Sequence, residues 1–180
     1  MVVWQDEHIV DELEVLIGEV PIMADAEAIQ VNRIDLKKHC AMAHAPAQAV
    51  ALLDGFLSKH FPNQRVPLAG QNIGFDVAFM QRLYRLAQAD FERRFSHRTI
   101  DTASIMGFLI LAGVLPIRDA SLNSGLAYFN IAFESGARHT ALADARCTAL
   151  LLTKLLEMVI ALRLSARLEG KADLPRTLRE

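Results

Sequence analysis

The sequence predicts an α/β fold built as one domain. Strand-like and helix-like segments alternate along most of the chain, which is typical of a sheet covered by helices. A length of 180 residues allows one domain with a hydrophobic core and is short for two. The hydrophobic fraction of 52% excludes intrinsic disorder. We therefore expect one domain over residues 1–168 and a polar tail over residues 169–180.

The N-terminal segment predicts an antiparallel hairpin. A short apolar run over residues 1–5 is followed by a polar turn at residues 6–8. From Ile9 to Ile17 the odd-numbered residues form one set and the even-numbered residues the other, and this two-residue alternation is the period of a strand. The mixed stretch from Pro21 to Ala45 shows no clear period, and we expect one or two short helices there.

The remaining elements follow from apolar periodicity and from breaks in it. Pro46 stands where a first helical residue is favoured, and the helix that it begins runs to Phe61. In the helix predicted over residues 74–88, Phe79, Leu83 and Leu86 share one face. Strands are expected at residues 66–70 and 99–101, and further helices at residues 102–114, 122–129 and 140–168.

Composition excludes some classes of protein. No apolar run reaches the roughly 18 residues that a membrane span needs. Cys40 and Cys147 lack the spacing of a metal site, so a reduced cytoplasmic setting is expected. A net charge of −2 argues against a protein that holds nucleic acid by bulk electrostatics alone. A metal-dependent nuclease escapes this objection, because its cations supply positive charge at the phosphate.

Two aspartates fall on core-facing positions near the starts of their helices. Asp76 extends the stripe of Leu83 backwards, and Asp144 extends that of Leu151. Each aspartate alone could cap its helix or interact with the helix dipole. If both face one cleft, a cation between them would offset their repulsion, and carboxylates are the ligands that Mg²⁺ or Mn²⁺ prefers.

His139 lies in a Gly-containing loop just before the final helix and close to Asp144. A lone loop histidine is commonly a surface residue, but beside a metal cleft it can accept a proton from water near neutral pH. The other five histidines have no comparable neighbours, and we interpret them as surface or structural residues.

Two segments resemble motifs of the DEDD-type 3′–5′ exonucleases of the histidine branch, the family of the proofreading subunit of bacterial DNA polymerase III. Residues 68–80, LAGQNIGFDVAFM, resemble its second motif, His-Asn, two residues, Phe-Asp, two residues, Phe-Leu, with Gln71 in place of the histidine. Residues 139–148, HTALADARCT, resemble its third motif, His-x-Ala-x-x-Asp-Ala-x-x-Thr. The resemblance extends roughly to Leu156.

The resemblance implies a ribonuclease H-like mixed sheet flanked by helices. It also implies two-metal hydrolysis that releases nucleoside monophosphates from the 3′ end of single-stranded DNA or RNA, with Mg²⁺ or Mn²⁺ as cofactor. Asp76 and Asp144 would hold the ions, and His139 would deprotonate the attacking water. The matched positions expected to contact substrate are Asn72, Phe75 and Phe79. Apolar periodicity alone would instead place the two phenylalanines in the core, and Asn72 could brace the loop. A polymerase or a second copy of the chain is a further partner that the resemblance leaves open.

One family feature is missing from the sequence. The first motif, Asp-x-Glu-Thr, supplies two of the four metal-binding carboxylates and lies on a central strand. When the chain is aligned on the second motif, residues 1–5 fall on the family's second strand. The strand of the first motif would then lie before Met1, so we expect a fragment or a misassigned start. Absence of that strand would leave unpaired backbone groups in the sheet. Glu7 and Glu12 are the hairpin carboxylates that could substitute.

The missing motif keeps a second function open, in which the chain is a non-catalytic relative that binds nucleic acid or a protein partner. A third interpretation is an ordinary α/β domain whose two aspartates only cap helices. Basic residues that could contact phosphates, or could simply form a solvated face, are Arg82, Arg85, Arg93, Arg94, His97 and Arg98.

Overall fold

The chain folds as a mixed α/β structure with two small sheets. The computed structural model describes residues 1–19, 35–132 and 140–168. Strands β1 (Val2–Gln5) and β2 (His8–Glu12) pair antiparallel, and strands β3 (Val66–Gly70) and β4 (Phe95–Asp101) pair parallel. The helices over the described residues are α2 (Leu36–Met42), α3 (Pro46–His60), α4 (Gly74–Leu86), α5 (Phe91–Arg94), α6 (Thr102–Leu111), α7 (Leu122–Tyr128) and α8 (Ala141–Leu168).

The predicted hairpin is confirmed. Its strands are joined by Asp6 and Glu7, both of which have positive φ angles, 48° and 66°. Two consecutive left-handed residues give the backbone twist that matches the flanking strands in a two-residue hairpin loop. The second strand ends at Glu12, short of the predicted Ile17, which forms only an isolated bridge to His44.

The strands do not form one continuous sheet over the described residues. β1 pairs with β2 alone, and β3 pairs with β4 alone. Each of these four strands therefore has one edge that pairs with no other described strand. β4 begins at Phe95, four residues before the predicted start at Thr99, because Phe95 pairs with Val66 as the apolar first rung of the parallel ladder.

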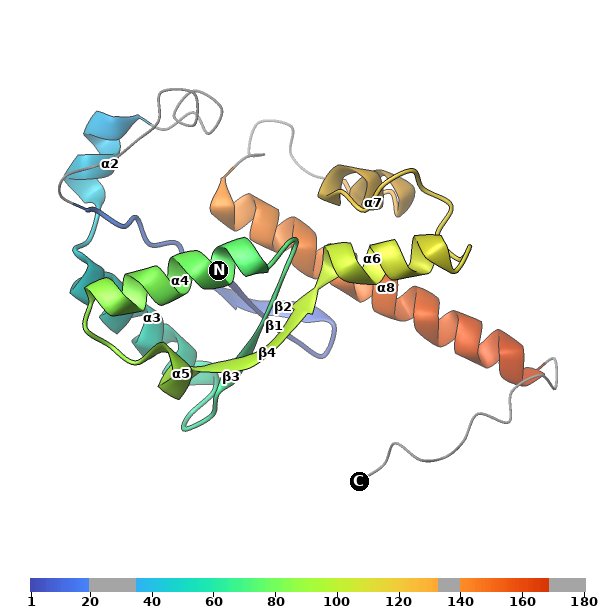
Figure 1. The fold of residues 1–180 in the computed structure, drawn as a ribbon, viewed down its shortest axis with the longest axis horizontal. Helices are drawn as coiled ribbons and strands as arrows, with labels where there is room; N and C mark the ends of the chain where they lie inside the picture. Colours follow the sequence, from blue (N-terminus) through green and yellow to red (C-terminus); the bar gives the residue numbers. More distant parts are fainter. Residues whose placement is uncertain (20–34, 133–139, 169–180) are drawn as a thin grey trace.

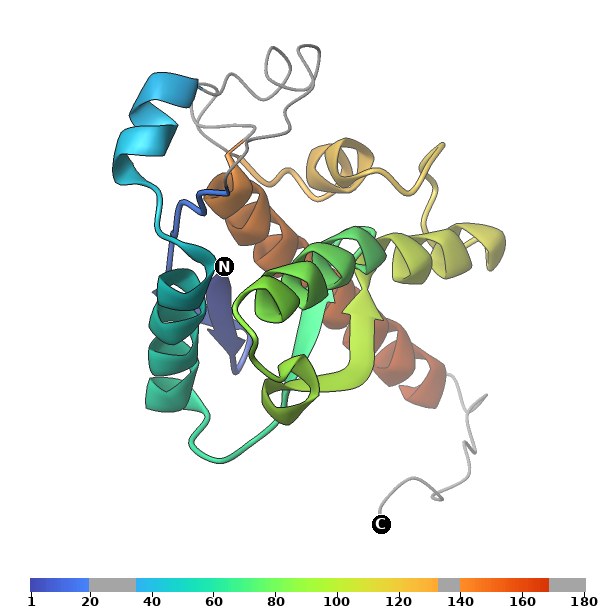
Figure 2. The same cartoon turned by 60° about the vertical axis from the view of Figure 1, so that its left-hand side comes forward.

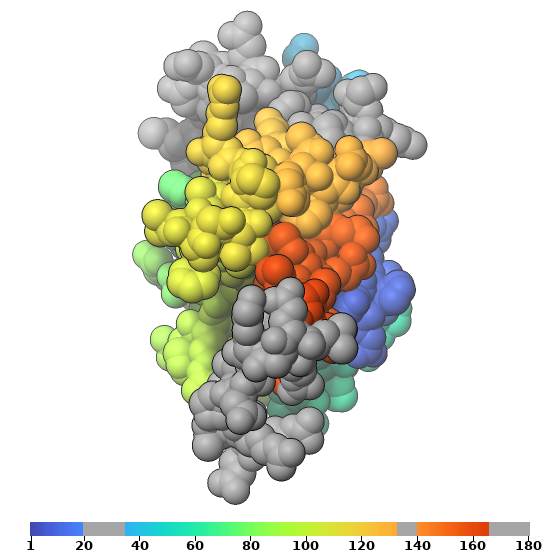
Figure 3. Space-filling model, turned by 90° about the vertical axis from the view of Figure 1, so that its right-hand side faces the viewer, coloured from blue at the N-terminus to red at the C-terminus, as the bar shows by residue number. Residues whose placement is uncertain are grey.

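Helices cover both faces of the strands. Figures 1 and 2 show α4 on one side of β3 and β4 and α8 on the other. α8 contacts β1, β2 and β3, so this one helix lies against both strand pairs. Figure 3 shows α8 reaching the surface between α6 and the N-terminal hairpin. No helix among the described residues is long and apolar enough to cross a membrane.

Two hydrophobic clusters fill the space between these layers. The first joins α3, β3, α4 and β4, and its fully buried members include Leu57, Tyr84 and Phe95. The second joins α6, α7 and α8 around Met106 and Leu151, both of which are 0% exposed. The face of α8 predicted from Leu151 is confirmed as the buried one.

The buried face of α4 differs from the prediction. The apolar stripe places Phe79 and Leu86 in the core, but their side chains are 70% and 45% exposed. The helix buries Leu83, as predicted, together with Tyr84, and turns Met80 partly inward. The prediction for Phe79 and Leu86 was wrong because the stripe leaves out Tyr84. The Tyr84 hydroxyl donates a 2.6 Å hydrogen bond to Asp54 Oδ1, and this partner allows the ring to be buried.

The Tyr84 hydroxyl provides a prediction about stability and pH. Burial and, to a smaller extent, the hydrogen bond to Asp54 raise the pKa of Tyr84 well above its ordinary value near 10. Because the unfolded chain loses this proton first, stability is fully present below pH 10 and falls as pH rises above it. We expect Tyr84→Phe to cost about 1–2 kcal/mol at pH 7 from the lost hydrogen bond. Urea unfolding between pH 7 and 11 should also show a shallower alkaline decline in the variant, and an unchanged decline would contradict this assignment.

Candidate active site

The loop between β3 and α4 is held by the end of β4. Asn72 adopts a positive φ of 55°, which asparagine tolerates, and its N–H donates to Asp101 Oδ1 at 2.8 Å. Asp101 also accepts from Ala103 N at 3.2 Å and from the Ser104 hydroxyl at 2.7 Å, so it caps α6. Burial alone would raise the pKa of Asp101, but these hydrogen bonds outweigh it and lower the pKa. Asp101 therefore fixes the backbone that precedes Asp76.

Gln71 braces the same loop from the other side. Its Nε2 donates to the carbonyl of Ala120 at 2.7 Å. Its Oε1 lies 2.6 Å from the hydroxyl of Thr102, which is 3.1 Å from the carbonyl of Gly70 and donates to one of these two acceptors. Thr102 is 0% exposed, so this pairing satisfies a buried hydroxyl. Gln71 thus links the loop to α6 and to the segment before α7.

Asp76 lies in the first turn of α4. Its side chain is exposed and not core-facing as predicted, because the buried face of α4 includes Tyr84 and leaves out Phe79, from which the position of Asp76 was extrapolated. Neighbouring atoms nevertheless displace part of its water, and this desolvation raises the pKa of its carboxyl. The carboxyl's own backbone N–H and the ammonium group of Met1 act in the opposite direction. Asp76 is thus an incompletely solvated carboxylate with one cation nearby.

Asp144 lies in the first turn of α8 and is half-buried, in agreement with the core-facing position predicted for it. Thr140 precedes the helix, and its Oγ1 accepts from Ala143 N at 3.2 Å, as an N-cap does. The Asp144 carbonyl accepts from the hydroxyl of Thr148 at 2.8 Å. The Asp144 carboxylate therefore does not make the capping bond of its helix, because Thr140 makes it.

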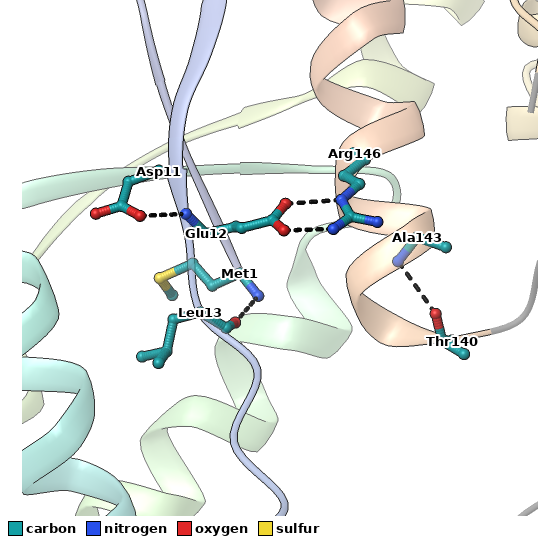
Figure 4. Close-up of polar contacts among 7 residues, drawn as sticks. All are labelled: Met1, Asp11, Glu12, Leu13, Thr140, Ala143 and Arg146. Atoms are coloured by element: carbon teal, nitrogen blue, oxygen red, sulfur yellow. Dashed lines mark hydrogen bonds and ion pairs between the residues drawn. The ribbon is translucent and has the colours of Figure 1, made fainter. Parts of the chain in front are cut away.

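The hairpin connects the regions around the two aspartates. The ammonium group of Met1 donates to the carbonyl of Leu13 at 2.9 Å. Burial lowers the pKa of this ammonium group, whereas the negative charges of Glu14, Glu12 and Asp76, in decreasing order, raise it. Glu12 accepts two hydrogen bonds from the guanidinium of Arg146, one of them 2.7 Å from Nε (Figure 4). Arg146 lies two residues after Asp144. Asp76 is therefore linked through Met1 and Glu12 to the start of α8.

Phe75 and Phe79 both point away from the core. Phe75 is 74% exposed and Phe79 is 70% exposed, one helical turn apart. Phe79 also lines a shallow hollow together with Ile17 and Leu83. Exposed aromatic rings of this size carry a cost in water, and such rings commonly mark a contact site. Asn72 is exposed as well, so all three expected substrate contacts are accessible to a ligand.

The described residues do not form a complete metal centre. No three histidine, cysteine, aspartate or glutamate side chains among them come together as a metal site. Asp76 and Asp144 are the two carboxylates of the matched motifs, and Mg²⁺ sites that keep several waters and bind a phosphate commonly use one or two carboxylates. His139, the expected base, lies outside the described residues.

The two hairpin carboxylates considered as substitutes have different surroundings. Glu7 lies in the hairpin turn, and its carbonyl accepts from Thr153, which is nine residues, or about 13 Å, along α8 from Asp144. Glu12 is near the start of α8, but its carboxylate is bound to Arg146, which lowers its pKa. Glu7 is therefore at the wrong end of the hairpin, and Glu12 is available only if Arg146 releases it.

Sequence patterns did not reveal three of these contacts. The bracing by Gln71, the bond from Asn72 N to Asp101 and the pair between Glu12 and Arg146 all join residues at least 29 positions apart. The only available signals were Asp101 at a strand-to-helix junction and Gln71 at a matched motif position. Long-range pairs of this kind leave no periodicity in the sequence.

The basic residues divide into two groups. Arg82 pairs with Glu19, and Arg94 lies 3.6 Å from Asp54 Oδ1 with its side chain only 13% exposed. These two arginines are structural. The side chains of Arg85, Arg93, His97 and Arg98 are exposed and form no ion pair with the described residues.

Comparison with known proteins does not assign this site. A scan against models of known protein families finds no match, and a search of curated proteins finds no similar sequence.

Proposed function

We propose that the chain is a 3′–5′ exonuclease domain of the DEDD type, histidine branch, with a ribonuclease H-like fold. It would hydrolyse phosphodiester bonds at the ends of single-stranded DNA or RNA and release nucleoside monophosphates. The carrying observation is that the two aspartates of the matched motifs stand in the first turns of α4 and α8, which Met1, Glu12 and Arg146 connect. The mixed α/β class and the parallel pairing of β3 with β4 are compatible with this proposal.

The local contacts support a role for Asp76 and Asp144 as ligands. Within residues 1–19, 35–132 and 140–168, neither carboxylate forms a hydrogen bond or ion pair with another side chain, and the only cation acting on Asp76 is the nearby Met1 ammonium. Desolvation raises the pKa of Asp76, which a bound cation would reverse by stabilising the charged form. Asp76 and Asp144 would hold Mg²⁺ or Mn²⁺, and such an ion stabilises the charge that develops on the phosphate and polarises the attacking water.

The surrounding residues would position and contact the substrate. Asp101 and Gln71 hold the loop that carries Asn72, so the start of α4 is fixed before substrate binds. Phe75 presents an exposed ring beside Asp76, where it can stack on a terminal base. His139, immediately before Thr140, would accept the proton of the attacking water.

A second function follows from the incomplete ligand set. Because the described residues do not gather three metal ligands, the chain could bind nucleic acid or a protein partner without cleaving. The two functions differ in one measurable property, which is metal-dependent shortening of an oligonucleotide from its 3′ end.

The test is a time course with single-stranded 20-nucleotide DNA and RNA carrying a 5′ fluorophore, in Mn²⁺, in Mg²⁺ and in EDTA. We expect a ladder that shortens from the 3′ end in the presence of metal, and no shortening with Asp144→Asn. Asp35→Asn is the matched control, because Asp35 caps α2, which carries none of the site residues, and its substitution removes the same charge. An oligonucleotide with a 3′ fluorophore should release its label in the first step.

Each outcome distinguishes the two functions. A ladder lost in Asp144→Asn and kept in Asp35→Asn supports the exonuclease. Cleavage that persists in Asp144→Asn would identify a contaminating nuclease and contradict the assignment. Absence of cleavage in a folded chain that binds the oligonucleotide would instead support the non-catalytic function.

A further inference from the structure

We propose that the surface formed by Arg65, Arg85, Arg93, His97 and Arg98, here called the β4 basic surface, binds the phosphate backbone of single-stranded nucleic acid. This inference rests on the proposed function, because it names where the substrate strand lies outside the site. It depends on charges and contacts away from Asp76 and Asp144, so it can be tested without catalysis.

The first observation is that these cations lack acidic partners. All five side chains are exposed, and none forms an ion pair with a described residue. Of the five arginines in residues 81–98, Arg82 and Arg94 pair with acidic residues outside the segment. The other three, with Arg65, still outnumber the two acidic residues of the segment. Asp90, one of the two acids, is already occupied in capping α5 through Glu92 N and Arg93 N. The local excess of positive charge is therefore left for a ligand.

The second observation is that the fold gathers these residues. Val66 pairs with Phe95, so Arg65, just before Val66, lies beside the junction of α5 and β4 that carries Arg93. α5 contacts both α4 and β4, which brings the last turn of α4, with Arg85, to the same end of the strands. The basic side chains thus come from the loop before β3 and from three elements, α4, α5 and β4, near the point where β3 and β4 begin.

The third observation is that β4 leads from this end toward the site. Its four consecutive residues 97–100 are all exposed, and it pairs only with β3 among the described strands. Seven residues at about 3.3 Å each make the strand about 23 Å long, enough for several nucleotides. It ends at Asp101, whose carboxylate holds the loop of Asn72 before Asp76. A single-stranded nucleic acid that lies along β4 would therefore have one end near Asp76.

A flexible single strand suits this surface better than other polyanions. The basic side chains are spread over the loop before β3, α4, α5 and β4 and do not belong to one loop or one helix end, so they match several phosphates of a chain and not a single phosphate. The exposed Ile100, at 40%, and Phe75, at 74%, lie toward the other end and offer apolar surface to unstacked bases. Duplex nucleic acid and acidic peptides lack these accessible bases, and they serve as comparisons in the test.

The test measures binding of fluorescein-labelled 20-nucleotide oligo(dT) and oligo(rU) by anisotropy, in EDTA, between 50 and 300 mM salt. The logarithm of the association constant falls linearly with the logarithm of salt concentration. For each phosphate that a variant no longer neutralises, the magnitude of this negative slope should decrease by about 0.7 for a single strand. We expect the double substitution Arg93→Gln with Arg98→Gln to reduce the slope by about 1.4 and to weaken binding at every salt concentration. The matched control is Lys37→Gln with Arg163→Gln, which removes the same charge from α2 and α8. Thermal unfolding by circular dichroism checks that both variants are folded.

The outcomes separate this inference from the proposed function. An unchanged slope in the Arg93 and Arg98 variant, or an equal reduction in the control, would overturn the β4 basic surface. Equal binding of a 20-residue poly-glutamate or of duplex DNA would overturn its assignment to single strands. Weakened binding confined to the β4 variant would support it, even in a chain that cleaves nothing, because no metal is present in this assay.

Discussion

Asp76→Asn is expected to abolish oligonucleotide cleavage without lowering stability at pH 7. A carboxylate that holds a metal ion cannot be replaced by a neutral amide, and loss of outer partners of metal ligands alone costs about 10–100-fold. We therefore expect activity to fall by more than about 100-fold. Desolvation raises the pKa of Asp76, so the folded chain binds this proton more tightly than the unfolded chain does.

The pH dependence of stability follows from this raised pKa. Stability is fully present below the ordinary pKa near 4 and falls as pH rises through the raised pKa of the folded state. Asparagine carries no such charge, so the stability of Asp76→Asn relative to the parent should increase from pH 3.5 to pH 7. Urea unfolding at these pH values measures the difference.

Asp119→Asn is a control with the opposite sign. Hydrogen bonds from Ser121 and Ser124 lower the pKa of Asp119, so its contribution is present at neutral pH and is lost as pH falls. The stability of Asp119→Asn relative to the parent should therefore decrease from pH 3.5 to pH 7. If Asp76→Asn behaves in the same way as Asp119→Asn, the carboxylate of Asp76 is a stabilising group and its proposed role as a ligand is wrong.

Leu151→Ala is expected to cause the largest loss of stability in the chain. Leu151 is 0% exposed and packs in the cluster that joins α6, α7 and α8. Loss of its side chain leaves a cavity between helices that are already in contact, and a fully buried leucine costs about 3–5 kcal/mol. For a domain of this size the melting temperature should fall by about 10 °C.

Gly125 provides an internal check on that cavity. A Cβ atom at Gly125 would lie 3.0 Å from both methyl carbons of Leu151 and 2.9 Å from the sulfur of Met106, so Gly125→Ala overpacks the contact between α7 and α8. In the Leu151→Ala background the two methyl groups are absent, and the added methyl group occupies their space. The double variant should be at least about 1 kcal/mol more stable than the sum of the single changes. Additive effects would show that the two residues are not in contact.

The order of elements could be predicted because each depends on local signals. Pro46 marks the start of α3, the polar residues 6–8 mark the hairpin turn, and Asp101 marks the end of β4. Amphipathic periodicity also predicted the buried face of α8, where Leu151 and Leu155 are 0% and 2% exposed. These features follow from backbone geometry and from the period of the apolar residues.

Periodicity was insufficient where a polar group is buried. On α4, a continuous apolar stripe led to the prediction that Phe79 is buried. Tyr84 takes the core position instead, because its hydroxyl donates a hydrogen bond to Asp54. Asp54 is on α3, thirty residues away, and no pattern within α4 reveals that partner. The same change of face leaves Phe75 and Phe79 exposed beside Asp76.

The candidate site divides in the same way. The sequence by itself determined which residues could carry the chemistry, since Asp76 and Asp144 follow from helix-start positions and from the two motifs. Only the tertiary structure decided their surroundings: Asp101 and Gln71 hold the loop before Asp76, and Arg146 occupies Glu12 beside α8. Local propensity acts over a few residues and is visible in the sequence, whereas hydrogen bonds and ion pairs between distant segments exist only once hydrophobic packing has brought those segments together.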